Sequence, residues 1–91
     1  MGKIIIKTYE EFNLTKRIKE GIKLLCNKYE EKGLSFLCGI NEEKQLIIVV
    51  KFKEIEDIEK VFDYKKDLEH LVSRLSSNIN YSFGLGVGYV E

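Results

Sequence analysis

The order of hydrophobic periodicities is the feature that most constrains the fold of this chain. Apolar residues recur every three or four positions in two segments, residues 8–32 and 55–75, as they do in amphipathic helices. Shorter segments rich in β-branched and aromatic residues indicate strands at residues 3–7, 34–40, 45–53 and 81–90. A chain of 91 residues has room for one domain with one two-layer core. We therefore predict a single domain, residues 1–91, with the element order β-α-β-β-α-β.

The connections between these segments predict how the strands pair. Residues 41–44 form a short polar turn, so the strands on either side of it are antiparallel neighbours. Each helix then returns the chain to the sheet by a right-handed crossover. These connections predict an α+β fold, the ferredoxin-like β-α-β-β-α-β sandwich. It has a four-stranded antiparallel sheet in the order 4-1-3-2, with both helices on one face.

Three residues set the expected limits and packing of the first helix. Thr8 fits the first position of a capping box, in which its hydroxyl accepts a hydrogen bond from an early helical N–H. Gly33 is expected to end the helix in a left-handed conformation. Gly21, in the helix interior, predicts a close crossing with another helix, because glycine otherwise weakens a helix by about 1 kcal/mol.

Side-chain alternation along the strands separates a core face from a second face, which we call the open face. Its predicted apolar centre consists of Ile5, Leu37, Ile47 and Val49. Its predicted rim, a candidate anion-binding group, consists of Lys3, Lys7, Lys51 and Lys53. The last strand adds a glycine track, Gly84, Gly86 and Gly88. Its bulky residues are expected to face the core: Tyr81, Phe83, Leu85, Val87 and Tyr89.

The composition of the open face predicts a binding function. A contiguous apolar patch usually marks an interface, and glycines let a backbone or a flat ligand approach closely. We expect this face to bind either a second copy of the chain, as a homo-oligomer, or a partner protein. An idle apolar surface, partly covered by the chain termini, is the alternative interpretation.

Charge and aromatic placement give no strong signal for nucleic acid. Fifteen basic residues balance fifteen acidic ones, so there is no basic excess to attract a phosphate backbone. RNA-binding sheets of this topology stack bases on aromatic side chains, whereas the open-face positions of the first and third strands are aliphatic. The absence of Ala, Pro and Trp, with lysine used far more than arginine, indicates an AT-rich genome.

The residues that usually carry catalysis or bind metals are sparse. The single histidine, His70, is expected to be exposed, and Cys26 and Cys38 lack the spacing of a zinc motif. Both thiols are expected to be buried and reduced, in a cytoplasmic protein. No apolar run is long enough to span a membrane. We predict no catalytic residues, no metal site and no cofactor, and hence a non-enzymatic regulatory module.

Two segments resemble the palm domain of diguanylate cyclases and CRISPR-type polymerases. Residues 36–43 read Phe-Leu-Cys-Gly-Ile-Asn-Glu-Glu, where that family has Gly-Gly-Asp/Glu-Glu in a turn between strands. Residues 81–88 read Tyr-Ser-Phe-Gly-Leu-Gly-Val-Gly, similar to the Ser-x-Gly-Val-Gly of its last strand.

The chain departs from this family at the residues that hold its metals. Ile40 replaces the second glycine, Asn41 takes the first acidic position, and isoleucines occupy residues 4–6, where the family has aspartates. Glu42 alone carries over, whereas nucleotidyl transfer in the family uses two metal ions held by several carboxylates. The resemblance therefore implies a palm without its catalytic carboxylates, which binds a nucleotide or cyclic nucleotide on the lysine-rimmed open face. An active member would be a nucleotidyl-transfer enzyme.

Overall fold

The computed structural model describes residues 2–8, 11–75 and 83–88, and for the last of these ranges it describes the strand without its side chains. The elements in chain order are β1 (Gly2–Thr8), α1 (Lys16–Glu30), β2 (Ser35–Ile40), β3 (Leu46–Phe52), the 3-10 turn η1 (Ile55–Asp57), α2 (Ile58–Leu75) and β4 (Phe83–Gly88). Within the described residues, no helix is both long and apolar enough to cross a membrane.

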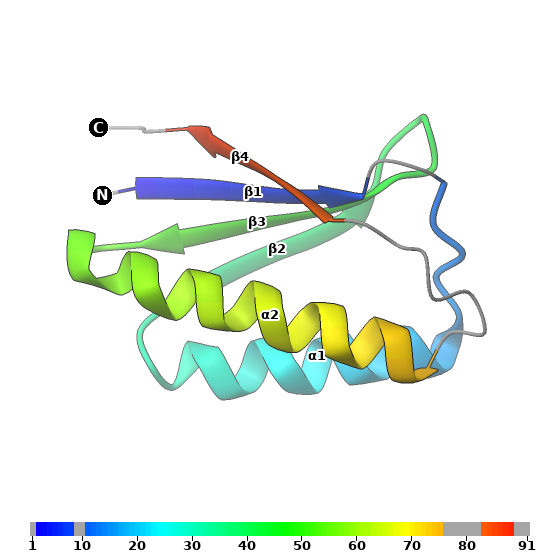
Figure 1. Cartoon of the computed structure of the whole chain (residues 1–91), viewed down its shortest axis with the longest axis horizontal. Helices are drawn as coiled ribbons and strands as arrows, with labels where there is room; N and C mark the ends of the chain where they lie inside the picture. The colour runs from blue at the N-terminus through cyan, green and yellow to red at the C-terminus, as the bar shows by residue number, and fades with distance from the viewer. Residues whose placement is uncertain (1, 9–10, 76–82, 89–91) are drawn as a thin grey trace.

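The strands form one layer and the helices the other (Figure 1). β3 lies between β1 and β2 and pairs antiparallel with both. β4 runs antiparallel along the other edge of β1, so that β2 and β4 are the two edge strands. Both helices cover the same face of the sheet, and the class is α+β.

The predicted four-stranded sandwich needs correction at its last strand. The sequence predicted a strand over residues 81–90 that fills the core with bulky side chains, but β4 is described for Phe83–Gly88 alone. The side chains of Tyr81, Phe83, Leu85, Val87 and Tyr89 lie outside the described part. The sandwich that the described side chains build therefore has three antiparallel strands, in the order 1-3-2, and two helices. Glycine at residues 84, 86 and 88 leaves the open face of β4 without side chains.

Alternation in the two central strands is confirmed by burial. β1 and β3 follow the same pattern, in which every second residue is buried against the helices. The helices contribute one apolar stripe each, at the three- and four-residue spacing of the sequence. The core contains residues from the strands, Ile4, Ile6, Leu46, Ile48, Val50 and Phe52, from the helices, Ile18, Ile22, Cys26, Tyr29, Val61, Tyr64, Leu68 and Val72, and from the connections, Phe12 and Leu34.

The predicted capping box at Thr8 is wrong. Thr8 is the last residue of β1, and its buried hydroxyl accepts a hydrogen bond of 3.0 Å from the backbone N–H of Leu46. The helix begins at Lys16, where the hydroxyl of Thr15 accepts from the N–H of Ile18 at 3.2 Å. The Thr8 hydroxyl is therefore bonded to the first residue of β3, and Thr15, the next threonine along the chain, caps α1 instead.

Replacing Thr8 with valine tests this contact. The side chain is 1% exposed, so Thr8→Val keeps its shape and leaves the N–H of Leu46 without its acceptor in a buried place. We expect the free energy of unfolding to fall by about 1–3 kcal/mol, measured by urea denaturation. Thr15→Val, at an exposed helix cap, is the comparison and should cost about 1 kcal/mol. A loss of less than about 1 kcal/mol for Thr8→Val would contradict the buried role of Thr8.

The two glycine predictions for the first helix are confirmed. A Cβ placed on Gly21 would lie 3.2 Å from the methyl groups of Leu71, so α1 and α2 cross closely at this point. Gly33 follows the end of α1 with a φ of 98°, in the left-handed region that glycine adopts without strain.

Candidate functional site

The strand register brings the predicted open-face residues together in three rows across the sheet. The middle row is apolar and consists of Leu37, Val49, Ile5 and Gly86. The row on one side of it consists of Ser35, Lys51, Lys3 and Gly88. The row on the other side consists of Gly39, Ile47, Lys7 and Gly84. The rows are what the alternation predicted, because residues directly opposite each other in antiparallel strands share a face.

Exposure differs along the apolar row. Leu37 is 61% exposed on the edge strand β2, whereas Ile5 and Val49 are half-buried between their neighbours. Ile47, in the next row, is also half-buried. Lys53 lies one residue beyond the end of β3 and so does not belong to these rows, although the sequence analysis included it in the rim.

The open face is electropositive on both sides of its apolar row. Lys3 and Lys51 stand directly opposite each other on β1 and β3, and Lys7 lies on the far side of the row. The sequences of β1, β2, β3 and β4 contain no Asp or Glu. Like charges opposite each other in a sheet repel, so an incoming group that carries negative charge would be favoured here.

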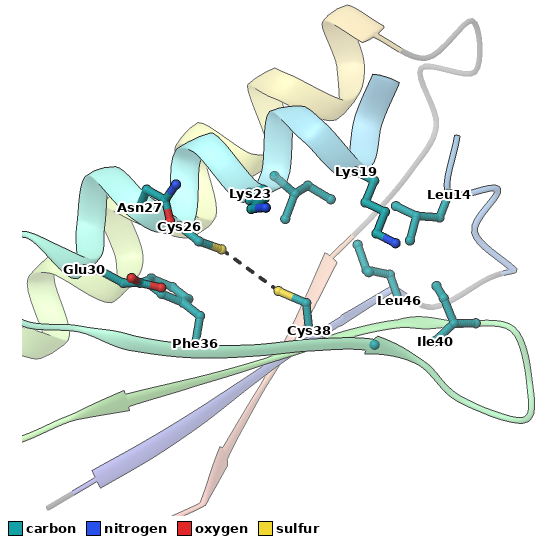
Figure 2. Close-up of a pocket in the computed structure, with 12 residues that line it drawn as sticks. Leu14, Lys19, Lys23, Cys26, Asn27, Glu30, Phe36, Cys38, Ile40 and Leu46 are labelled. Atoms are coloured by element: carbon teal, nitrogen blue, oxygen red, sulfur yellow. Dashed lines mark hydrogen bonds between the residues drawn. The ribbon is translucent and has the colours of Figure 1, made fainter. Parts of the chain in front are cut away.

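A second feature is a cavity of about 520 Å³ between α1 and the edge strand β2 (Figure 2). Its apolar walls are Leu14, Ile22, Phe36, Ile40 and Leu46. Its polar lining consists of Lys19, Lys23, Asn27 and Glu30 from α1, and Cys26 and Cys38 face each other across it. Leu37 and Gly39 lie on the open face, so alternation puts Cys38 and Ile40 on the side of β2 that faces the helices; yet both are exposed, because α1 does not cover the outer part of β2. The expectation that both thiols are buried is therefore wrong for Cys38.

The two thiols form a contact within this cavity. The Sγ atoms of Cys26 and Cys38 lie 4.0 Å apart, and the hydroxyl of Tyr64 lies 3.3 Å from the Cys26 sulfur. Hydrogen bonding from Cys38, and to a smaller extent from Tyr64, lowers the pKa of Cys26 to about 7, against the opposing effect of burial. The same contact raises the pKa of Cys38, because the Cys38 thiol keeps its proton and donates it in a hydrogen bond to the Cys26 sulfur.

Sequence reasoning missed this pair because it judged the two cysteines by their spacing along the chain and expected each to be a separate buried thiol. The signal was available in the pattern: Cys26 lies on the apolar stripe of α1, and Cys38 lies on the helix-facing side of β2. A helix and a strand joined by a short turn face each other, so residues on their inner sides meet.

Other candidate residues stand apart from both features. His70 is exposed, as the sequence predicted, and Glu42 is exposed in the turn before β3. Asn41 closes that turn, since its side chain accepts from the N–H of Gln45 at 2.8 Å. Across the described ranges, no three His, Cys, Asp or Glu side chains are grouped so that they could hold a metal ion.

Comparisons with protein-family models, with curated proteins and with solved structures give no match to this chain. The resemblance to palm domains stays a prediction that rests on residues 36–43 and 81–88. Function is therefore inferred from the geometry of the open face and of the cavity.

Proposed function

We propose that this chain is a small, non-enzymatic regulatory module that docks a protein partner on its open face. The observation that carries the proposal is the apolar row of Leu37, Val49 and Ile5, flanked by lysines on strands that contain no acidic residue. Protein interfaces combine an apolar centre with a polar rim. The partner that fits is a protein surface with an apolar centre and an acidic border.

Charge favours a different protein over a second copy of this chain. Two open faces stacked about a two-fold axis would present lysines to lysines, with no carboxylate from any of the strands between them. Like charges brought together at an interface disfavour that pairing. We place the module in the cytoplasm, an assignment supported by its two free cysteines.

Val49→Glu tests the docking proposal. The change puts a carboxylate in the middle of the apolar row, on the side away from the helices. It should weaken the affinity for the partner by at least about tenfold. Leu24→Glu is the matched control, because Leu24 is 70% exposed on α1, in the other layer. Wild type and both variants are immobilised and exposed to an extract of the source cells, and proteins retained by wild type and Leu24→Glu but lost with Val49→Glu are identified.

Two further measurements complete this test. The isolated partner should bind wild type less tightly as salt concentration rises, and Lys51→Glu should weaken it further, because the pairing is between opposite charges. Sedimentation velocity of the wild type should show a monomer. A dimer that Val49→Glu dissociates would show that a second copy occupies the face, and a partner retained equally by Val49→Glu would contradict docking there.

A second candidate function is nucleotide binding on the same face. The observation that favours it is the pair of lysines Lys3 and Lys51, which lie next to Gly88 in the register, a residue with no side chain of its own to block a flat ring. Thermal melting with ATP, GTP and cyclic di-GMP tests it. A rise in melting temperature that Lys51→Glu abolishes would support this function, and no rise with any of the three would exclude these nucleotides.

A further inference from the structure

We propose that the cavity between α1 and β2 is a thiol–disulfide exchange site, in which a small anionic disulfide oxidises Cys26 and Cys38 to an intramolecular disulfide. This site is separate from the open face, and its function does not depend on what the open face binds. Three observations carry the proposal: the distance between the two sulfurs, their access from the cavity, and the charge of the residues that line it.

The distance between the sulfurs is short enough for a bond to form with a small movement. The Sγ atoms lie 4.0 Å apart, and a disulfide requires about 2 Å. Rotation of the cysteine side chains provides part of this approach. β2 supplies the rest, because it is an edge strand with a hydrogen-bonded neighbour, β3, on one side of the described sheet.

Both thiols border the cavity, and they differ in exposure. Cys38 is exposed, whereas Cys26 is only 6% exposed and meets the cavity where its sulfur lines the wall opposite Cys38 (Figure 2). The Tyr64 hydroxyl, 3.3 Å from the Cys26 sulfur, can donate a hydrogen bond to a thiolate there. The cavity volume of about 520 Å³ lies within the range that small-molecule sites occupy.

The lining selects the class of oxidant. All three charged residues of the lining come from α1. Lys19 and Lys23 contribute two positive charges, and Glu30, at the end of the cavity away from Lys19, contributes one negative charge (Figure 2). The remaining walls are apolar apart from Asn27 and the thiols. A small disulfide with carboxylate groups would be attracted to the lysines, whereas a cationic disulfide would be repelled by them.

The reaction balances as an exchange of two electrons. The Cys26 thiolate attacks one sulfur of the disulfide RSSR, the S–S bond breaks, and RS⁻ leaves with the electron pair. Cys38 loses its proton to solvent, and its sulfur attacks the Cys26 sulfur of the mixed disulfide. The second RS⁻ leaves, and the two thiolates released take up protons. Two protein thiols are oxidised to one disulfide, and RSSR is reduced to two thiols.

Formation of the bond is tested with oxidised glutathione as the anionic probe. The reduced protein is equilibrated with mixtures of reduced and oxidised glutathione, quenched with acid, and its free thiols are counted by alkylation and mass spectrometry. We expect loss of both thiols without a retained glutathione. The disulfide should form in the folded protein at an oxidant ratio at least about tenfold lower than in guanidinium, because the native geometry favours the bond.

The order of attack and the charge preference are tested with variants. Cys38→Ser should accumulate one glutathione on Cys26, an adduct that does not accumulate in wild type. We compare the rate of thiol oxidation by oxidised glutathione with the rate by cystamine, a cationic disulfide. The ratio of the two rates should fall at least about threefold in the Lys19→Gln/Lys23→Gln variant. Lys16→Gln/Arg17→Gln, on α1 but outside the cavity lining, is the matched control and should leave the ratio unchanged.

Each contrary result overturns a stated part of the proposal. Two free thiols, or a stable glutathione adduct on wild type, would show that the sulfurs do not pair in the folded protein. An equal oxidant requirement in guanidinium would show that the fold gives the bond no advantage. An unchanged rate ratio in the cavity lysine variant would refute the anionic class of oxidant.

Discussion

Tyr64→Ala is expected to lower the free energy of unfolding by about 3–5 kcal/mol, a large share of what a domain of this size possesses. Tyr64 is fully buried on α2, between the two helices and the sheet. Its ring packs against Tyr29 at a centroid distance of 5.5 Å and against Phe36 at 4.6 Å. Its removal opens a cavity at the place where α1, α2 and β2 meet, and the surrounding backbone cannot close it.

Tyr64→Phe separates the ring from its hydroxyl group. This variant keeps the packing and loses the contact of 3.3 Å with the Cys26 sulfur, so we expect a cost of about 1 kcal/mol. Both variants are measured by urea denaturation followed by circular dichroism. A loss of less than about 1 kcal/mol for Tyr64→Ala would contradict its place at the centre of the core.

Raising the pH above about 10 is expected to lower the free energy of unfolding steeply. The hydroxyl of Tyr29 donates a hydrogen bond of 2.7 Å to the carboxylate of Asp67. Burial, and then this hydrogen bond to Asp67, raise the pKa of Tyr29 well above the ordinary value of 10.0. Burial also raises the pKa of Tyr64. Both tyrosines therefore keep their protons in the folded state at pH values where the unfolded chain releases them.

The sign of the effect follows from this difference in proton binding. Below pH 10 both states hold the two tyrosine protons and the contribution of the tyrosines to stability is fully present, and above pH 10 the unfolded state gains by releasing them. Each tyrosine contributes a loss of about 1.4 kcal/mol per pH unit, so the two together contribute about 2.8 kcal/mol per unit.

The measurement is the free energy of unfolding in urea between pH 7 and about pH 11.5. Tyr29→Phe should reduce the slope above pH 10 by about 1.4 kcal/mol per unit, because one of the two protons no longer distinguishes the states. A Tyr29→Phe variant with the wild-type slope would contradict the raised pKa of Tyr29 in the folded state.

The open face and the cavity lie on opposite sides of the same edge strand, β2. Leu37 extends the apolar row onto the open side of β2, and Cys38 faces the cavity on its other side. A disulfide from Cys38 to Cys26 would tie this strand to α1. The variants chosen for each surface are distinct, so failure of the exchange proposal and failure of the docking proposal are distinguishable.

The sequence by itself determined which side of each central strand is buried. The alternation of Ile4 and Ile6 with Lys3, Ile5 and Lys7 is a period of two, and a strand with this period has one apolar face wherever it lies. The short turn before β3 made β2 and β3 antiparallel neighbours, and the crossovers placed β1 beside β3. The three rows of the open face follow from these local and topological rules.

The tertiary structure alone decided where the helix begins, how far it covers the sheet and which thiols meet. The residues that follow Thr8 match the pattern of a helix cap. In the structure, however, the Thr8 hydroxyl accepts a hydrogen bond from the N–H of Leu46, 38 positions away. Periodicity shows that Cys38 points to the helix side of β2, and it contains no information on whether α1 reaches that far. Coverage of an edge strand, and a contact of 4.0 Å between two sulfurs, depend on the packing of whole elements against each other, which no local pattern specifies.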